Sequence, residues 1–272
     1  VDGLFNPREI KLSPDGNHAY VAGSSDKSVS WFTRNSATGL LTYGGTLKDG
    51  VGGAEGLDGA FGITFSNDGS YLYVTGNYEN SVSVYQRNSG TGALVFSEVL
   101  RDDYGGVDGL NNAQSVTLSP GGDHIYVVGN GDNAVSTYDL NASSGLLTQT
   151  DVIKQGDGSL NGLDGAWDVT LSADGNHAYV TGIFDDAVSW YERNATTGAL
   201  TYGGMLKDGV DGVDGLKGAD SVTLSSDGNH AYITGASDDA VSWYERNAST
   251  GALSYGGMLK DGVDGVDGLK GA

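Results

Sequence analysis

The residues of this chain best suited to hold a metal ion are aspartates in two identical linkers. They stand three residues apart and each is followed by glycine: Asp208, Asp211 and Asp214, repeated as Asp261, Asp264 and Asp267. Carboxylate and carbonyl oxygens are the ligands that calcium prefers. Successive aspartates of an extended triplet would lie roughly 9 Å apart, so one ion could reach them only where glycine lets the chain fold back. We therefore expect either a calcium site or plain Asp-Gly turns in these linkers.

A second group of candidate residues recurs at one position every 53 residues. The pairs found there combine a cation, carboxylates, an amide and aromatic rings: Arg8-Glu9, Phe61-Gly62, Gln114-Ser115, Trp167-Asp168 and Asp220-Ser221. Two further aromatic residues, Tyr78 and Phe184, follow a predicted strand in the second and fourth copies. We predict a ligand-binding surface made of Arg8, Glu9, Phe61, Tyr78, Gln114, Trp167, Asp168, Phe184 and Asp220. The alternative is that these short loops vary because they tolerate change.

These residue types suit two kinds of chemistry. Glu9, Asp168 or Asp220, together with Arg8 or a metal held by the linker aspartates, could activate a water molecule for ester hydrolysis. Aromatic rings such as Trp167, beside acids and amides, could instead stack against a carbohydrate ring.

The four histidines do not form a cluster. His18, His124, His177 and His230 occupy one position of the repeat, where the second copy has Tyr71. Each follows a turn on the face opposite the linkers, so we predict a structural role for all four. A Ser-His-Asp relay is then not expected at the ligand-binding surface.

The elements that must position these residues belong to a repeat of 53 residues. Five full copies run without slippage over 4–56, 57–109, 110–162, 163–215 and 216–268, and Leu269 begins a sixth. The last two full copies differ at nine positions. A period of this length indicates a modular fold, which we treat as one domain over 1–272.

Each copy reads as four short antiparallel strands. In the fourth copy the strands are predicted over 167–172, 177–182, 186–193 and 199–206, with Asp-Gly and Asn-rich turns between them. No segment has a sustained helical period. Four-stranded units repeated at this length are typical of the blades of an all-β propeller. We predict five blades, either as a closed ring of five or as a segment of a longer array.

Three segments resemble a known family. Ser13 to Gly23, Tyr73 to Gly76 with Ser81 to Tyr85, and Tyr179 to Gly182 contain Tyr-Val-Thr-Gly or close variants. They are similar to the YVTN-type repeats of lactonase-like β-propellers, and the resemblance extends over all five copies. It implies a propeller fold and, as an activity, the hydrolysis of a cyclic ester. Propellers of that family usually have seven blades, and no catalytic motif of the family can be transferred residue by residue.

Composition narrows the partners. With 35 acidic and 14 basic residues the net charge is −21, which repels nucleic acids and anionic lipid surfaces. The absence of cysteine excludes disulfides and thiolate chemistry. Regular blades, acidity and the lack of a catalytic constellation favour a non-catalytic, secreted or cell-surface binding or structural module, self-associating or part of an extracellular polymer. The alternatives are a lactonase-like hydrolase and a carbohydrate-binding propeller.

Overall fold

The computed structural model describes residues 2–271, where twenty β-strands form five antiparallel sheets of four strands each. Within that range there is no helix of the length and apolarity needed to cross a membrane. The predicted all-β fold of four-stranded blades is confirmed, and we number the sheets blade 1 to blade 5 in chain order. Their strands are β1 (Pro7–Leu12), β2 (His18–Gly23), β3 (Ser28–Arg34), β4 (Leu41–Lys48), β5 (Ala60–Phe65), β6 (Tyr71–Gly76), β7 (Ser81–Arg87), β8 (Leu94–Arg101), β9 (Ala113–Leu118), β10 (His124–Gly129), β11 (Ala134–Leu140), β12 (Leu147–Lys154), β13 (Ala166–Leu171), β14 (His177–Gly182), β15 (Ala187–Arg193), β16 (Leu200–Lys207), β17 (Ala219–Leu224), β18 (His230–Gly235), β19 (Ala240–Arg246) and β20 (Leu253–Lys260).

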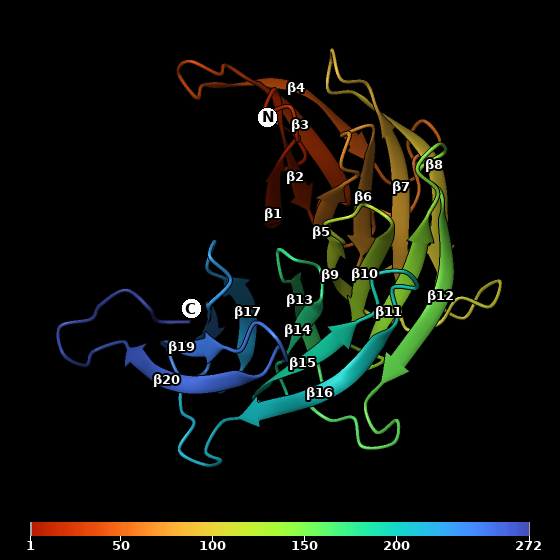
Figure 1. Cartoon of the computed structure of the whole chain (residues 1–272). Coiled ribbons are helices and arrows are strands. Elements are labelled where there is room, and N and C mark those ends of the chain that lie inside the picture. Colours follow the sequence, from red (N-terminus) through yellow and green to blue (C-terminus); the bar gives the residue numbers. More distant parts are fainter. Residues whose placement is uncertain (1, 272) are drawn as a thin grey trace.

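Each blade is a meander in which every strand pairs with the next one along the chain. The first strands β1, β5, β9, β13 and β17 lie innermost, and the fourth strands lie outermost (Figure 1). Successive blades pack side by side, but blade 1 and blade 5 stand apart, so the five blades form an open arc (Figure 1). A closed ring of five, one of the two expected arrangements, is not formed. Side-chain packing sets the angle between neighbouring blades, and the angles between these five do not complete a full turn.

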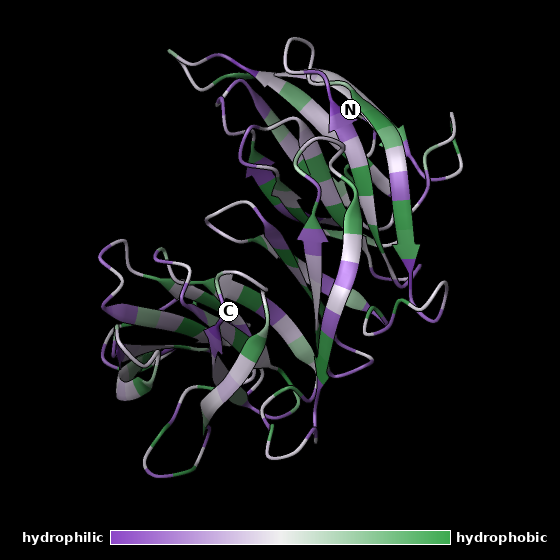
Figure 2. Ribbon diagram, turned by 45° about the vertical axis from the view of Figure 1, so that its right-hand side comes forward, coloured by the Kyte–Doolittle hydropathy of each residue, from purple (hydrophilic) through white to green (hydrophobic). Residues whose placement is uncertain are grey.

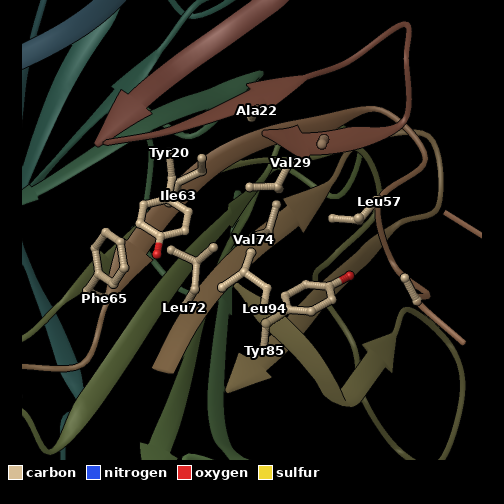
Figure 3. Packing of buried hydrophobic residues seen from close by; sticks show 12 residues of the cluster. Tyr20, Ala22, Val29, Leu57, Ile63, Phe65, Leu72, Val74, Tyr85 and Leu94 are labelled. Atoms are coloured by element: carbon tan, nitrogen blue, oxygen red, sulfur yellow. The ribbon is translucent and has the colours of Figure 1, made fainter. Parts of the chain in front are cut away.

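Apolar side chains are needed on both faces of a blade. Residues alternate between the faces along each strand, so Val180 packs in the cluster shared with blade 3 and its neighbour Tyr179 in the cluster shared with blade 5. Hydrophobic residues recur along the strands throughout the molecule (Figure 2). Where blades 1 and 2 meet, Tyr20 and Val29 pack against Ile63 and Leu72, all of them fully buried (Figure 3). We call such an interface a seam, and similar clusters fill the other three seams. Burying one residue such as Ile63 contributes about 1.5–3 kcal/mol.

A polar contact accompanies the apolar packing at three of the seams. Between blades 3 and 4, the hydroxyl of Tyr126 donates to the carbonyl of Gly198 at 2.7 Å. Arg193 donates through Nε to that hydroxyl and lies with Nη2 2.9 Å from Nδ1 of His124. The other two seams have the same contact, formed by His18, Tyr20 and Arg87 and by His177, Tyr179 and Arg246. The predicted structural role is confirmed for His18, His124 and His177, whereas the side chain of His230 makes no such contact within residues 2–271.

A β-bulge opens every first strand. In blade 4 the pairing register shifts between Ala166 and Val169, so Trp167 and Asp168 fall outside the regular ladder. The same shift occurs in the other four blades. Bulges redirect side chains and are common beside functional sites. Thr181, from the Tyr-Val-Thr-Gly segment, holds this bulge by accepting the N–H of Asp168 at 3.1 Å.

Replacing Gly182 by alanine should lower the melting temperature. A Cβ at this position would stand 2.6 Å from the carbonyl oxygen of Gly162 in the linker before blade 4. Overpacking of this kind costs about 1–3 kcal/mol. Gly90→Ala is the matched control, since the nearest atom to a Cβ there lies at 3.4 Å. Thermal unfolding followed by circular dichroism checks this, and equal melting temperatures for the two variants would contradict it.

Acidification should destabilise the arc through the seam histidines. Burial, and then the neighbouring arginine, lower the pKa of His18, His124 and His177 below the ordinary value of 6.5. The unfolded chain therefore binds more protons below pH 6.5, so stability is complete above that pH and falls as the pH decreases. Between about pH 7 and pH 5, we expect the melting temperature of His124→Asn to fall less than that of the unsubstituted chain. An equal fall in melting temperature for both proteins would show that protonation of His124 does not contribute to the acid destabilisation.

Candidate functional site

The bulges of the first strands surround a cavity of about 570 Å³ on the inner side of the arc, which we call the channel. All five first strands contribute residues to it. It brings together six of the residues predicted to bind a ligand: Arg8, Glu9, Phe61, Trp167, Asp168 and Asp220. The bulge explains this grouping, because it turns equivalent side chains of different blades toward one axis.

One part of the channel wall is aromatic and cationic. The rings of Phe61 and Trp167 meet edge to face, with centroids 5.8 Å apart and an interplanar angle of 89°. The guanidinium of Arg8 stands over the Phe61 ring, 5.1 Å from its centroid. A cation held against an aromatic face is stabilised there and still has N–H groups free to bind an oxygen atom. This wall can therefore pack against an apolar ring face and bind a polar substituent.

Two of the channel carboxylates hold blades together. An Oε2 of Glu9 accepts the N–H of Ile63 in the next blade at 2.6 Å. Asp168 of blade 4 contacts both of its neighbouring blades. It accepts the N–H of Val222 in blade 5 at 3.0 Å and the hydroxyl of Ser115 in blade 3 at 2.8 Å. Because their lone pairs are used by backbone and hydroxyl groups, Glu9 and Asp168 are poorly placed to take a proton from water.

Asp220 differs from these two carboxylates. It is half-buried, and no hydrogen bond reaches its carboxylate from any residue between 2 and 271. Burial, and then the negative charge of Asp168, raise the pKa of Asp220 above its ordinary value of 3.8. A partly desolvated carboxylate with a raised pKa and unused lone pairs has the properties of a general base.

Three predicted residues lie outside the channel. Gln114 is 97% buried within blade 3, although it occupies the same bulge position as Trp167. Tyr78 and Phe184 lie on exposed loops, where each ring covers a linker glycine, Gly59 or Gly165. Tyr78 and Phe184 therefore do not line the channel beside Trp167, and carbohydrate binding by the three aromatic residues stays a prediction.

Sequence reasoning also missed part of the channel wall. Lys11, Ser115, Thr117, Thr170 and Thr223 line it as well. Four of them follow a bulge residue by two positions, so the strand period of two could have identified them. Lys11 is paired with Glu9, with Nζ and Oε1 3.1 Å apart.

The linker aspartates come together only in part. Carboxylate oxygens of Asp208 and Asp214 lie within 4.8 Å of each other and of one from Asp238, which belongs to the loop after β18. Asp211 instead adopts a left-handed conformation, with φ of 51°, where the linker turns. A second such group, not predicted from the sequence, consists of Asp102, Asp108 and Asp132.

The second linker behaves differently. Asp261, Asp264 and Asp267 form no such group within residues 2–271, where no loop stands against them as the Asp238 loop stands against Asp208 and Asp214. Lysines also approach both groups, Lys260 lying 3.3 Å from Asp238 and Lys154 2.7 Å from Asp108. An ammonium group thus neutralises part of the charge that a calcium ion would balance. Calcium binding stays a prediction.

Asp208→Asn should raise the melting temperature in chelator at neutral pH, by about 1–3 °C. Burial and the neighbouring carboxylates of Asp238 and Asp214 raise the pKa of Asp208, so its ionised form costs stability, while asparagine can still accept the N–H of Leu216. Asp211→Asn, on an exposed residue outside the group, is the control. If calcium binds here, millimolar calcium should raise the melting temperature of the unsubstituted chain and not of Asp208→Asn. A melting temperature that calcium leaves unchanged would exclude the calcium site.

Solved structures share this fold at low sequence identity. A putative 6-phosphogluconolactonase from Bacteroides uniformis aligns with a TM-score of 0.73 and 18% identity, over 90% of this chain and 68% of its own. A periplasmic gluconolactonase from Pseudomonas aeruginosa aligns with a TM-score of 0.74 and 18% identity, over 94% of this chain and 70% of its own. A protein from Lactobacillus plantarum aligns with a TM-score of 0.77 and 19% identity, over 93% of this chain and 71% of its own. A comparison with curated proteins finds no match.

The family is shown by the sequence itself. The profile of the family described as "Lactonase, 7-bladed beta-propeller" matches residues 53–204 and, in an overlapping alignment, 115–260, which together are well over half of the chain. This match corrects the expectation of a non-catalytic extracellular binding or structural module. That expectation gave too much weight to the missing histidine relay, which a propeller that uses carboxylates does not need. The chain belongs to the lactonase family of seven-bladed β-propellers.

Proposed function

We propose that this protein hydrolyses a sugar lactone in the channel, with Asp220 as the general base. The observation that carries the proposal is the state of Asp220: it lines the cavity, has a raised pKa and makes no hydrogen bond through its carboxylate within residues 2–271. Membership of the lactonase family supports the reaction class, and neighbours named as gluconolactonases support the substrate class.

The reaction needs one activated water and one proton relay. Asp220 takes a proton from the water as its oxygen attacks the lactone carbonyl. The tetrahedral intermediate then collapses, the ring C–O bond breaks, and the departing ring oxygen takes the proton back from Asp220 to become a hydroxyl. The net change is the addition of one water to the ester, which gives a hydroxy acid and returns the carboxylate to its starting state.

The remaining channel residues would bind and orient the substrate. Arg8 can donate to the carbonyl oxygen, on which negative charge develops in the transition state. The Phe61–Trp167 pair offers an apolar surface to the face of the sugar ring. Burial, and then the negative charge of the neighbouring Asp168, raise the pKa of Asp220 and so make it a stronger base.

Charge favours a neutral substrate over a phosphorylated one. The chain carries a net charge of −21, and the channel wall holds the three carboxylates of Glu9, Asp168 and Asp220 against the two cations of Arg8 and Lys11. The overall field therefore opposes the approach of a phosphate ester. We expect an unphosphorylated sugar lactone such as glucono-δ-lactone to be hydrolysed with the higher kcat/KM.

Asp220→Asn should reduce lactone hydrolysis by about 10²- to 10⁴-fold, the usual contribution of a general base. The rate is measured with glucono-δ-lactone and a pH indicator, after subtraction of the spontaneous reaction. Asp211→Asn, which removes the same charge from an exposed linker, should keep full activity. The acid limb of kcat/KM should lie above pH 3.8, since the pKa of Asp220 is raised. An unsubstituted chain no faster than the spontaneous reaction across a lactone panel would refute the proposed function, and a fully active Asp220→Asn would refute the role of Asp220.

A further inference from the structure

The first strand of each blade has a free edge that faces the channel. In blade 3, β9 pairs only with β10, and the N–H of Ser119 donates to the carbonyl of His124 at 2.8 Å. Bonded pairs alternate with non-bonded pairs along an antiparallel ladder, so Val116 and Val127 are a non-bonded pair. The N–H of Val116 therefore points away from β10, and Val116 lines the channel.

Two other blades use the equivalent N–H to bind a carboxylate. Ile63 of blade 2 and Val222 of blade 5 have the same place in the ladder as Val116. The N–H of Ile63 donates to Glu9 of the preceding blade at 2.6 Å, and that of Val222 donates to Asp168 at 3.0 Å. A hydrogen bond from N–H to an ionised oxygen is stronger than one between neutral groups. This backbone position is thus a donor that takes an anionic oxygen.

Blade 2 supplies no carboxylate to blade 3, because its residue at this position is Gly62. A Cβ on Gly62 would stand 3.1 Å from the nitrogen of Val116 and 2.5 Å from the carbonyl oxygen of Gln114. The backbone of Gly62 is thus beside the Val116 N–H, and no side chain within residues 2–271 accepts that N–H. Gly62 and Val116 both line the channel, so an acceptor has to come from a molecule in the channel.

The seam between blades 3 and 4 differs from the one between blades 2 and 3. Ser115 occupies the position of Gly62 there, and its hydroxyl donates to Asp168 at 2.8 Å. The side chain of Ser115 fills the space beside the next N–H, that of Val169. Of these four seams, only the one at Gly62 leaves the space beside the N–H free of side-chain atoms.

We propose that the N–H of Val116 binds the carbonyl oxygen of the lactone and, after hydrolysis, an oxygen of the carboxylate of the sugar acid. The inference rests on the proposed function and adds a backbone donor to it. Negative charge develops on the carbonyl oxygen in the transition state, and a fixed N–H stabilises that charge without having to reorganise. The substrate oxygen takes the place that a protein carboxylate has at Ile63 and Val222. Gly62 is a positioning residue, since its missing side chain keeps this place open.

The test follows the backbone amides of the full chain by proton–nitrogen NMR while sodium gluconate is added at constant ionic strength. The amide proton of Val116 should move downfield, because it gains a hydrogen bond to a carboxylate. Those of Ile63 and Val222 should keep their shifts, because their acceptors are already in place. Sorbitol, the uncharged polyol of the same chain length, should leave Val116 unmoved. A Val116 amide that gluconate does not move, or that sorbitol moves equally, would overturn the proposal.

Two substitutions test the role of the missing side chain. Glu9→Gly, which copies Gly62, should make the amide of Ile63 respond to gluconate as that of Val116 does. Gly62→Ala should raise the Kd for gluconate about 10-fold or more, the usual effect of losing a hydrogen bond to a charged group. Gly90→Ala, in an exposed turn, is the matched control and should leave the Kd unchanged. An unchanged Kd in Gly62→Ala would refute the assigned position, and the titration of Glu9→Gly decides if Gly62→Ala does not fold.

Failure of this inference is distinguishable from failure of the proposed function. A chain that binds gluconate at Val116 but hydrolyses no lactone would refute the enzyme activity and leave the carboxylate site intact. A chain that hydrolyses the lactone while gluconate leaves the Val116 amide unmoved would refute the backbone donor alone.

Discussion

Each blade carries apolar side chains on both faces, and a single four-stranded sheet has no means of burying either face by itself. Burial has to come from the neighbouring blades, so residues such as Tyr20, Ile63 and Leu72 stabilise the fold only as members of a seam. This requirement explains why one 53-residue unit can be repeated without other support. It also explains why the polar residues that accompany it come from two neighbouring blades, His124 and Tyr126 from blade 3 and Arg193 from blade 4.

The same packing creates the functional site. Once the blades stand side by side, their first strands line a common axis, and the bulge in each strand brings one or both of its residues to the channel. In blade 4 the Tyr-Val-Thr-Gly segment contributes both to the packing between blades and to the bulge that lines the channel. Tyr179 bonds across the seam, and Thr181 holds the bulge while donating to the carbonyl of Asp220 in the next blade at 3.0 Å. Fold and channel therefore depend on one short stretch of sequence.

Repetition made the blade, the strand order and the channel position predictable, since equivalent residues of a propeller must lie at equivalent places. It could not distinguish residues at the same repeat position. Gln114 and Trp167 share a position, yet one is buried in its blade and the other lines the channel. Asp168 and Asp220 looked alike as carboxylates, and only hydrogen bonding separates them. The open arc was equally beyond the sequence, because the angle at a seam depends on how side chains of two blades fit together.

The proposed catalytic role of the channel depends most directly on the state of one carboxylate, that of Asp220. A pH titration of the aspartate side chains by carbon-13 NMR measures it without reference to any substrate. We expect Asp220 to titrate above 3.8, and we expect Asp168→Asn to move the pKa of Asp220 downward because a neighbouring negative charge is removed. A pKa of Asp220 at or below 3.8, unmoved by Asp168→Asn, would contradict the claim that the channel holds a carboxylate prepared to act as a base.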